Sequence, residues 1–484
     1  MSYLELLKLA SPEGIVVVTA LVVLAIGLTT ERASASCSAI AALGLAIAIG
    51  AVLMLPPKAT LFGGMLAITP LTSLFKIICL GLALFTVFLA HSDRASRNPG
   101  EYLAMLLLAT IGLMLLVGSE ELLMIFIGLE LLGLSLYVMT AFDKTDVRSA
   151  EAGLKYFLFG STASAFTLFG ISFIYGMSGT TGLSAIGQKL SSGPVQPLLA
   201  VGIVMTLIGF AFKIAAAPFH LWAPDAYQGA PVPSAAFIAS GSKVASFVVL
   251  GKIVLVGFAP VHGSADWHAM VAGWSPVLAA LAASSILVGN LVALAQTNVR
   301  RLLAYSAVAH AGYTLLGLVA GGREGFSATL FYTTIYAVTL VGAFGVVALV
   351  RRQTGGDDFR NFAGLASRSP LLAGCMSIFI LSLAGIPPLA GFFGKFYLFG
   401  VTLGAGGNHG LLWLVALALF GSLISLYYYL IVLKVIFVDE AATQTSPVKV
   451  DLLSRISLSA LALLVLLLGI APEAVVTRII ASLP

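Results

Sequence analysis

Long apolar runs dominate this chain and restrict the folds that it can adopt. The hydrocarbon core of a bilayer is about 30 Å thick, and a helix of roughly 20 apolar residues crosses it. Along 484 residues, that length predicts about fourteen transmembrane helices and an all-α polytopic membrane protein. Only 9% of the residues are charged, against roughly 25% in soluble proteins. The expected spans are 15–30, 38–55, 74–91, 103–118, 121–140, 154–175, 198–222, 233–258, 276–296, 302–320, 326–350, 370–403, 411–436 and 456–471.

Basic residues in alternate loops indicate the orientation of the chain, because short cytoplasmic loops carry an excess of lysine and arginine. Thirteen basic residues lie on one side: Arg32, Arg94, Arg97, Lys144, Arg148, Arg300, Arg301, Arg351, Arg352, Arg360, Arg368, Lys449 and Arg455. The five on the other side are Lys8, Lys58, Lys189, Arg323 and Arg478. Both termini are therefore predicted to lie outside. The net charge of +5 reflects this asymmetry and does not indicate nucleic-acid binding.

The sequence lacks the ligand patterns of protein-bound electron carriers. Iron–sulfur clusters need grouped thiolates, haem needs axial ligands, and dinucleotides bind glycine-rich turns. The three cysteines, Cys37, Cys79 and Cys375, are scattered, and the fifty glycines are spread through the apolar spans, where they favour close helix packing. We therefore expect no cofactor or metal in this chain. Any chemistry must occur within the membrane, because no soluble domain interrupts the spans.

Four ionisable residues lie near the middle of expected spans. They are Glu130 in IFIGLELLGLSLYV, Lys213 in GFAFKIAAAPF, Lys243 in ASGSKVASF and Lys395 in AGFFGKFYLF. A charge at mid-bilayer costs from about 2.5 kcal/mol upward, so such residues indicate function by default. Each residue alone could form a structural ion pair, but glycines and serines hold helices together at lower cost. Lysine suits proton transfer, because its pKa falls on desolvation and rises when a carboxylate approaches.

Other lysines are weaker candidates, and their roles stay open. Lys155 and Lys434 lie at the ends of spans. Lys252 lies nine residues beyond Lys243, which places the two side chains on opposite faces of one helix. Lys76, at the start of a span, can extend its side chain to the membrane interface.

Two expected spans contain helix breakers beside a buried lysine. Pro218 follows Lys213, and the pair Pro387 and Pro388 precedes Lys395. Proline removes a backbone hydrogen bond and clashes with the preceding turn, so both helices should be interrupted. Unwound backbone at membrane depth is tolerated only where protein or a hydrated cavity satisfies it.

The two interrupted spans are the seventh and the twelfth, so they stand five spans apart. An odd offset reverses the direction through the membrane, which predicts two inverted five-helix repeats, each with a broken helix. Within a single transmembrane domain over 1–484, we expect helices 1–3 in 1–100, the first repeat in 101–260, the second repeat in 274–438 and helix 14 in 452–484.

Three motifs make the chain resemble a known family: KIAAAPFHLWAPDAYQGAP, NVRRLLAYSAVAHAGY and LAGIPPLAGFFGKFYLF. They are similar to motifs of the antiporter-like subunit N family of respiratory complex I, the proton-translocating NADH:quinone oxidoreductase, over nearly the whole length. The first motif also occurs, altered, in subunits L and M and in Mrp-type antiporters. The YQGAP ending at Tyr227 to Pro231 resembles subunit N. So does Lys395, where subunit M usually has a glutamate.

The resemblance implies roles for individual residues. Glu130 with Lys213 would form the input pair, Lys243 the central relay and Lys395 the output lysine. His310, in SAVAHAGY, is a candidate link between the two half channels. His220 either bonds the interrupted backbone or takes part in transfer.

The resemblance also implies a location and partners. The chain would be a multi-pass protein of the bacterial inner membrane with both termini in the periplasm. Its partners would be the lipid bilayer and other membrane subunits, including antiporter-like ones. A peripheral arm carrying FMN, iron–sulfur clusters, NADH and quinone sites would act on it indirectly. Two alternatives remain: a subunit of a multisubunit Mrp-type cation/proton antiporter, driven by an ion gradient, and a passive scaffold that anchors other subunits.

Overall fold

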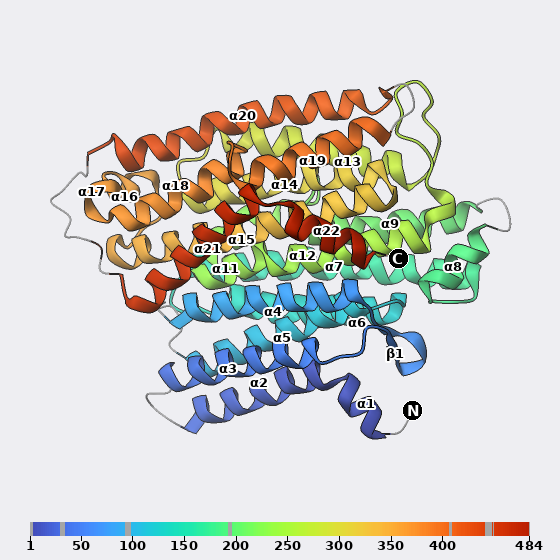
Figure 1. The fold of residues 1–484 in the computed structure, drawn as a ribbon, viewed down its shortest axis with the longest axis horizontal. Helices are drawn as coiled ribbons and strands as arrows, with labels where there is room; N and C mark the ends of the chain where they lie inside the picture. Colours follow the sequence, from blue (N-terminus) through green and yellow to red (C-terminus); the bar gives the residue numbers. More distant parts are fainter. Residues whose placement is uncertain are drawn as a thin grey trace.

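The computed structural model describes residues 3–29, 34–91, 98–191, 196–405, 409–440, 448 and 450–483. Long helices run side by side, and the first and last helices end at the same end of the bundle (Figure 1). In the described part of the chain, twelve helices are long and apolar enough to span a membrane. Two shorter apolar helices, Pro197–Lys213 and Pro370–Ala384, bring the total to the expected fourteen. The predicted class of fold is confirmed.

The N-terminal part contains three of the expected spans and one element that was not expected. Two short strands pair antiparallel, with Ala59 opposite Ile68. The turn between them uses Gly63 and Gly64 with positive φ angles of 68° and 94°, which glycine adopts without steric cost. The elements are α1 (Tyr3–Leu9), α2 (Ser11–Thr29), α3 (Ser34–Leu53), β1 (Ala59–Leu61), β2 (Leu66–Ile68) and α4 (Pro70–His91).

The following elements fall in the region expected for the first repeat. They are α5 (Pro99–Gly118), α6 (Leu122–Thr140), α7 (Val147–Ser178), α8 (Leu183–Leu190), α9 (Pro197–Lys213), α10 (Trp222–Gly229), α11 (Val232–Ala239) and α12 (Gly241–Lys252). A π-helical turn, Ile253–Gly257, continues α12, and a 3-10 turn, Ala259–Val261, follows.

The remaining helices cover the expected second repeat and the C-terminal part. They are α13 (Trp274–Ala293), α14 (Val299–Ala320), α15 (Gly322–Thr354), α16 (Phe359–Phe362), α17 (Leu365–Arg368), α18 (Pro370–Ala384), α19 (Ala390–Ala405), α20 (Leu412–Phe437), α21 (Leu452–Ile470) and α22 (Glu473–Ser482). Of the basic residues that predicted the orientation, Arg32, Arg94, Arg97 and Lys449 lie outside the described residues.

The seventh span is interrupted as predicted, and neighbouring side chains satisfy the interrupted backbone. Helix α9 ends at Lys213, five residues before Pro218. In the gap, the Ala217 N–H donates to Ser285 Oγ at 2.9 Å, and Ser284 Oγ donates to the Ala217 carbonyl at 2.9 Å. The indole of Trp222 donates to the Phe212 carbonyl at 3.1 Å. Serines of α13 therefore hold the break in a fixed geometry.

The twelfth span is interrupted between α18 and α19, where Gly385 has a φ of 86° and closes α18. The N–H of Gly391 donates to Ser382 Oγ at 3.1 Å, so α18 supports the first turn of α19. Both breaks contain a cis peptide bond, Ala217–Pro218 in one and Pro387–Pro388 in the other.

A third break, between α11 and α12, was not predicted. It lies at Ser240, whose φ of −115° and ψ of −84° are not helical. Lys243 follows it within the first turn of α12. Each of the three candidate lysines, Lys213, Lys243 and Lys395, therefore lies next to an interruption of its own span.

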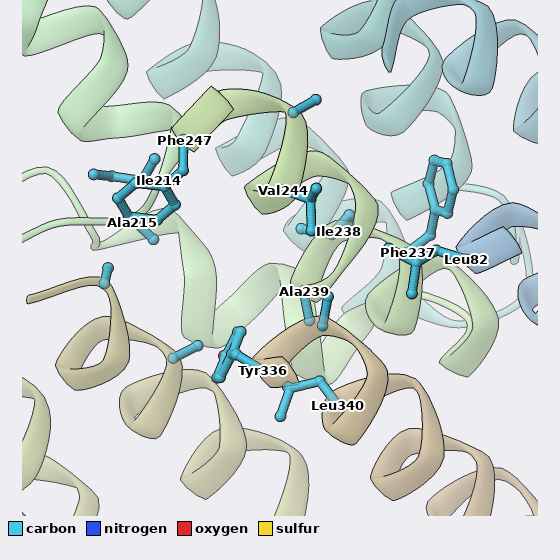
Figure 2. Close-up of a cluster of buried hydrophobic side chains, with 14 of the residues drawn as sticks. Leu82, Ile214, Ala215, Phe237, Ile238, Ala239, Val244, Phe247, Tyr336 and Leu340 are labelled. Carbon is cyan, nitrogen blue, oxygen red and sulfur yellow. The ribbon is translucent and has the colours of Figure 1, made fainter. Parts of the chain in front are cut away.

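The most buried helices are α14, α15 and the segment from α11 to the π-helical turn. In each of these spans, 94% of the most apolar 18-residue window is buried, against 28% in α2. Figure 2 shows part of the apolar cluster around them, where Ile214 of the first break and Phe247 of α12 lie together. The candidate residues Lys243 and His310 are buried residues of two of these helices, α12 and α14.

A buried ion-pair network ties the helices together at the end of the bundle opposite the termini, near α16 (Figure 1). Arg300 Nη1 of α14 lies 3.3 Å from Asp357 Oδ2, and its other terminal nitrogen donates to the Ala230 carbonyl. Asp357 also pairs with Arg351 at 3.1 Å and accepts from Asn298 Nδ2 at 2.8 Å. The network joins α14, the end of α15 and the turn between α10 and α11.

Candidate functional site

Lys243 projects from α12 towards helices of the second half of the chain. Its Nζ donates to the Ala307 carbonyl of α14 at 2.6 Å. It also lies 5.4 Å from the ring centre of Tyr336 of α15. The side chain is buried, and in the described part of the chain it has no carboxylate within 4.0 Å.

His310 lies in the middle of α14 and is hydrogen-bonded through both ring nitrogens. Its Nδ1 lies 2.8 Å from the Tyr332 hydroxyl, and its Nε2 lies 3.2 Å from the Tyr429 hydroxyl. The Tyr429 hydroxyl in turn lies 2.5 Å from Ser306 Oγ. Hydroxyls and imidazoles both donate and accept protons. The four groups therefore form a hydrogen-bonded chain through which a proton can pass.

Lys395 is the third buried candidate residue of this central region. Its Nζ donates to the Ala384 carbonyl at 3.0 Å and to Ser422 Oγ at 2.9 Å. The Ala384 carbonyl is the last of α18, so the interrupted helix supplies an acceptor to the lysine that follows the break. The Nζ also lies 5.3 Å from the ring centre of Tyr313.

Two tyrosine rings connect His310 with the two lysines. Tyr336 lies 4.9 Å from the imidazole, between ring centres, and contacts Lys243. Tyr313 lies 5.6 Å from the imidazole and contacts Lys395. The structure thus brings together three sequence-predicted residues from separate helices, with His310 in the middle. Lysine in a protein interior can occupy either protonation state, unlike arginine, so this arrangement can accept and release protons.

Glu130 and Lys213 lie near one another but are not paired. Glu130 Oε1, on α6, accepts a 2.5 Å hydrogen bond from Ser164 Oγ of α7. In the described part of the chain, no ion pair within 4.0 Å joins Glu130 to Lys213. Both residues line a cavity of about 20 Å³ together with Ser164 and Tyr137. A cavity of this size holds about one water molecule. The structure therefore shows the pair in an open arrangement, with Ser164 holding the carboxylate.

The weaker candidates occupy different environments. Lys155 is 40% exposed and pairs with Glu151 at 2.6 Å and with Asp225 at 2.8 Å. Lys434 is more exposed and lies 3.6 Å from Asp439. His220 is buried at the first break, and its Nδ1 has no hydrogen-bond partner in the described part of the chain.

The expectation that Lys76 extends to the membrane interface is wrong. Its side chain is 5% exposed and lies 2.6 Å from Glu13 Oε1 of α2. The pairing could not be predicted from the sequence, because the two residues are far apart along the chain and Glu13 precedes the first expected span. Lys252 is also paired, with Glu120 at 2.6 Å.

Sequence reasoning missed the tyrosines around His310. Tyr332 and Tyr336 are four residues apart in LFYTTIYAV, a spacing that places both on one helical face. Tyr429 belongs to the run SLYYYLIV in an otherwise apolar span. Polar aromatic residues repeated at helical spacing inside a span were the signal that could have identified them.

Comparisons with known proteins find relatives that cover nearly the whole chain. A family model described as "NADH:quinone oxidoreductase/Mrp antiporter, TM" matches residues 119–425. The chain is 47% identical, over 98% of both chains, to "NADH-quinone oxidoreductase subunit N 2" of Acidobacterium capsulatum. It is 41% identical to "NADH-quinone oxidoreductase subunit N" of Moorella thermoacetica, over 84% of this chain and 83% of that one.

Solved structures show the same fold. A chain of respiratory complex I from Thermus thermophilus superimposes with a TM-score of 0.81 and 33% identity, over 96% of this chain and 98% of that chain. A chain of the Mrp complex from Dietzia superimposes with a TM-score of 0.85, over 99% and 97% of the two chains. Its identity of 21% shows a shared fold alone.

Proposed function

We propose a proton path through this chain, which belongs to the antiporter-like, proton-translocating subunit N family of NADH:quinone oxidoreductase. The path begins at Glu130 and Lys213, continues to Lys243 and His310, and ends at Lys395. The observation that carries this proposal is the central arrangement of His310 between the two lysines. Tyr336 and Tyr313 lie between the imidazole and each ammonium group.

The input of the path differs in its chemistry from the two later lysines, Lys243 and Lys395. At the input, a carboxylate close to a lysine favours the charged form of the lysine, and its withdrawal favours proton release. At Lys243 and Lys395 the acceptors are neutral carbonyl and hydroxyl groups, so charge arriving from a neighbouring site meets no local counter-ion. Charge changes can therefore be relayed along the path, because interactions between charges are strong in a medium of low dielectric.

Pumping through this path needs an external source of free energy. Moving one elementary charge against 100 mV costs about 2.3 kcal/mol. We propose that this chain holds no redox cofactor and that other subunits oxidise NADH and reduce quinone. It would receive this free energy through neighbouring membrane subunits. Both termini and the β1–β2 hairpin would lie on the periplasmic side of a bacterial inner membrane. We further propose that α5–α12 and α13–α20 form the two inverted repeats.

The Mrp-type antiporter is the second candidate function, because the family model and the fold are shared with it. The 47% identity to a subunit N supports the oxidoreductase instead. Sodium-dependent proton movement in vesicles without NADH would favour the antiporter.

Ser164→Ala tests the input of the path. A hydrogen bond to a charged group contributes about 1.5–3 kcal/mol. Without the hydroxyl, the Glu130 carboxylate is released from Ser164 and should pair with Lys213, which would hold the proton there. We expect NADH-driven proton uptake by inverted vesicles, normalised to assembled complex, to fall several-fold. Ser164→Thr keeps a hydroxyl and should restore pumping. Equal pumping by both variants and the unmodified chain would show that the hydrogen bond is not part of the input.

A further inference from the structure

A second group of buried charges lies outside the proposed path. Lys252 is the last residue of α12, and its side chain is 5% exposed. Its Nζ lies 2.6 Å from Glu120 Oε1 and donates to the Ser119 carbonyl at 2.6 Å and the Val117 carbonyl at 3.2 Å. The ammonium group therefore has three acceptors, of which only Glu120 can take up its proton.

The Glu13–Lys76 ion pair lies beside this one. A Cβ atom at Gly118 would stand 3.6 Å from Lys76 Nζ, while the carbonyls on either side of Gly118 bind Lys252. Both ammonium groups therefore surround the last residue of α5. The partial negative charge at a helix C-terminus stabilises cations, which accounts for two lysines at this place.

Only one of the two pairs reaches a large cavity. A cavity of about 840 Å³ lies between the ends of α4, α12, α15 and α22. Glu120 and Lys252 line it, as do His262 and Arg323, whereas Glu13 and Lys76 are not among its lining residues. A cavity of this volume has room for many water molecules. The Glu120 carboxylate is 32% exposed, so water can reach it.

We infer that Glu120 and Lys252 form a proton-exchange site of the first repeat, which opens through this cavity at the end of the bundle that carries the termini. This inference rests on the proposed function. Lys252 donates its proton to the Glu120 carboxylate, which leaves a neutral amine and a neutral carboxylic acid. The acid then releases the proton to water in the cavity. The amine takes up the next proton from the membrane interior, which restores the charged pair.

Helix α12 connects this site with the proposed path. Lys243 lies in its first turn and Lys252 at its end, about 14 Å apart along the axis. The two side chains face different neighbours, α14 for Lys243 and the turn after α5 for Lys252. A change of charge on Lys243 therefore acts on Lys252 through the protein interior, where screening by solvent is weak.

Lys252→Arg tests the inference and Lys76→Arg is its matched control. Arginine keeps the positive charge and the ion pair but does not release its proton in proteins. Both lysines are 5% exposed and lie 2.6 Å from their carboxylates, so the two substitutions impose similar steric demands. We expect Lys252→Arg to lower NADH-driven proton uptake per assembled complex by at least about tenfold, as for loss of a proton-transferring group. Lys76→Arg should pump like the unmodified chain.

Equal pumping by the two arginine variants would overturn the inference. If Lys252→Arg does not assemble, Glu120→Gln with Glu13→Gln as its control makes the same comparison, because glutamine keeps the shape and removes the proton acceptor. Lys395→Met separates this result from failure of the proposed function. Loss of pumping in Lys395→Met with normal pumping in Lys252→Arg would reject the exchange site alone. Normal pumping in both would reject the path as well.

Discussion

Lys395→Ala is expected to abolish most of the proton pumping of the assembled complex. The Lys395 ammonium is the titratable group of α19 that contacts the central region, where it bonds Ala384 and Ser422 and lies against Tyr313. Alanine cannot hold a proton, so the path ends without its output group. We expect NADH-driven proton uptake by inverted vesicles, per assembled complex, to fall by at least about tenfold.

Two controls separate loss of the charge from loss of packing in Lys395→Ala. Lys395→Met retains an apolar side chain of similar length and should lose pumping to the same extent. Lys434→Ala removes a lysine that is 65% exposed and should leave pumping unchanged. Normal pumping and NADH oxidation in Lys395→Ala and in Lys243→Ala would contradict the roles proposed for both lysines.

Arg300→Ala is expected to destabilise the chain more than a substitution of any exposed charge. The Arg300 side chain is fully buried and binds Asp357 and the Ala230 carbonyl. Removing one partner of a buried ion pair costs about 3–5 kcal/mol, because the other charge stays in the interior. The remaining contacts of Asp357 with Arg351 and Asn298 place the expected cost at the lower end of this range.

The neighbouring Arg301 provides the matched control for Arg300→Ala. Its side chain is 29% exposed and pairs with Asp225 at 2.9 Å, so Arg301→Ala should cost about 1 kcal/mol or less. Thermal denaturation of the purified complex and the fraction of tagged chain found in it measure the difference. Pumping per assembled complex should be unchanged in both variants. Equal stability of Arg300→Ala and Arg301→Ala would show that the buried network does not hold the helices together.

The spans could be predicted from the sequence, because the thickness of the bilayer sets the length of apolar helix that crosses it. It also predicted the two breaks, because Pro218 and the Pro387–Pro388 pair cannot continue a helix. The break at Ser240 escaped prediction, since serine and glycine both occur inside membrane helices and neither lacks a backbone N–H as proline does. The β1–β2 hairpin escaped because its strands have three residues each, too short for a periodic pattern.

Residues of the candidate site could be predicted only where one residue is unusual by itself in its sequence context. Glu130 and the three lysines stood out because a charge inside an apolar span is costly. Partners distant in sequence were not visible: Glu13 for Lys76, Glu120 for Lys252 and Ser164 for Glu130. These pairings depend on how the helices pack in three dimensions. The assignment of roles to Glu130, Lys213, Lys243, His310 and Lys395 stays a proposal, as does the division into repeats.

The most direct test of the path is proton uptake by a chain that carries both Lys243→Met and Lys395→Met, compared with the two single variants. Residues that act in series on one path are not additive in their effects. We therefore predict that the double variant pumps at the rate of the slower single variant, per assembled complex. Two results would contradict a common path for Lys243 and Lys395. One is normal pumping by both single variants. The other is a fold-loss of pumping in the double variant that equals the product of the two single fold-losses.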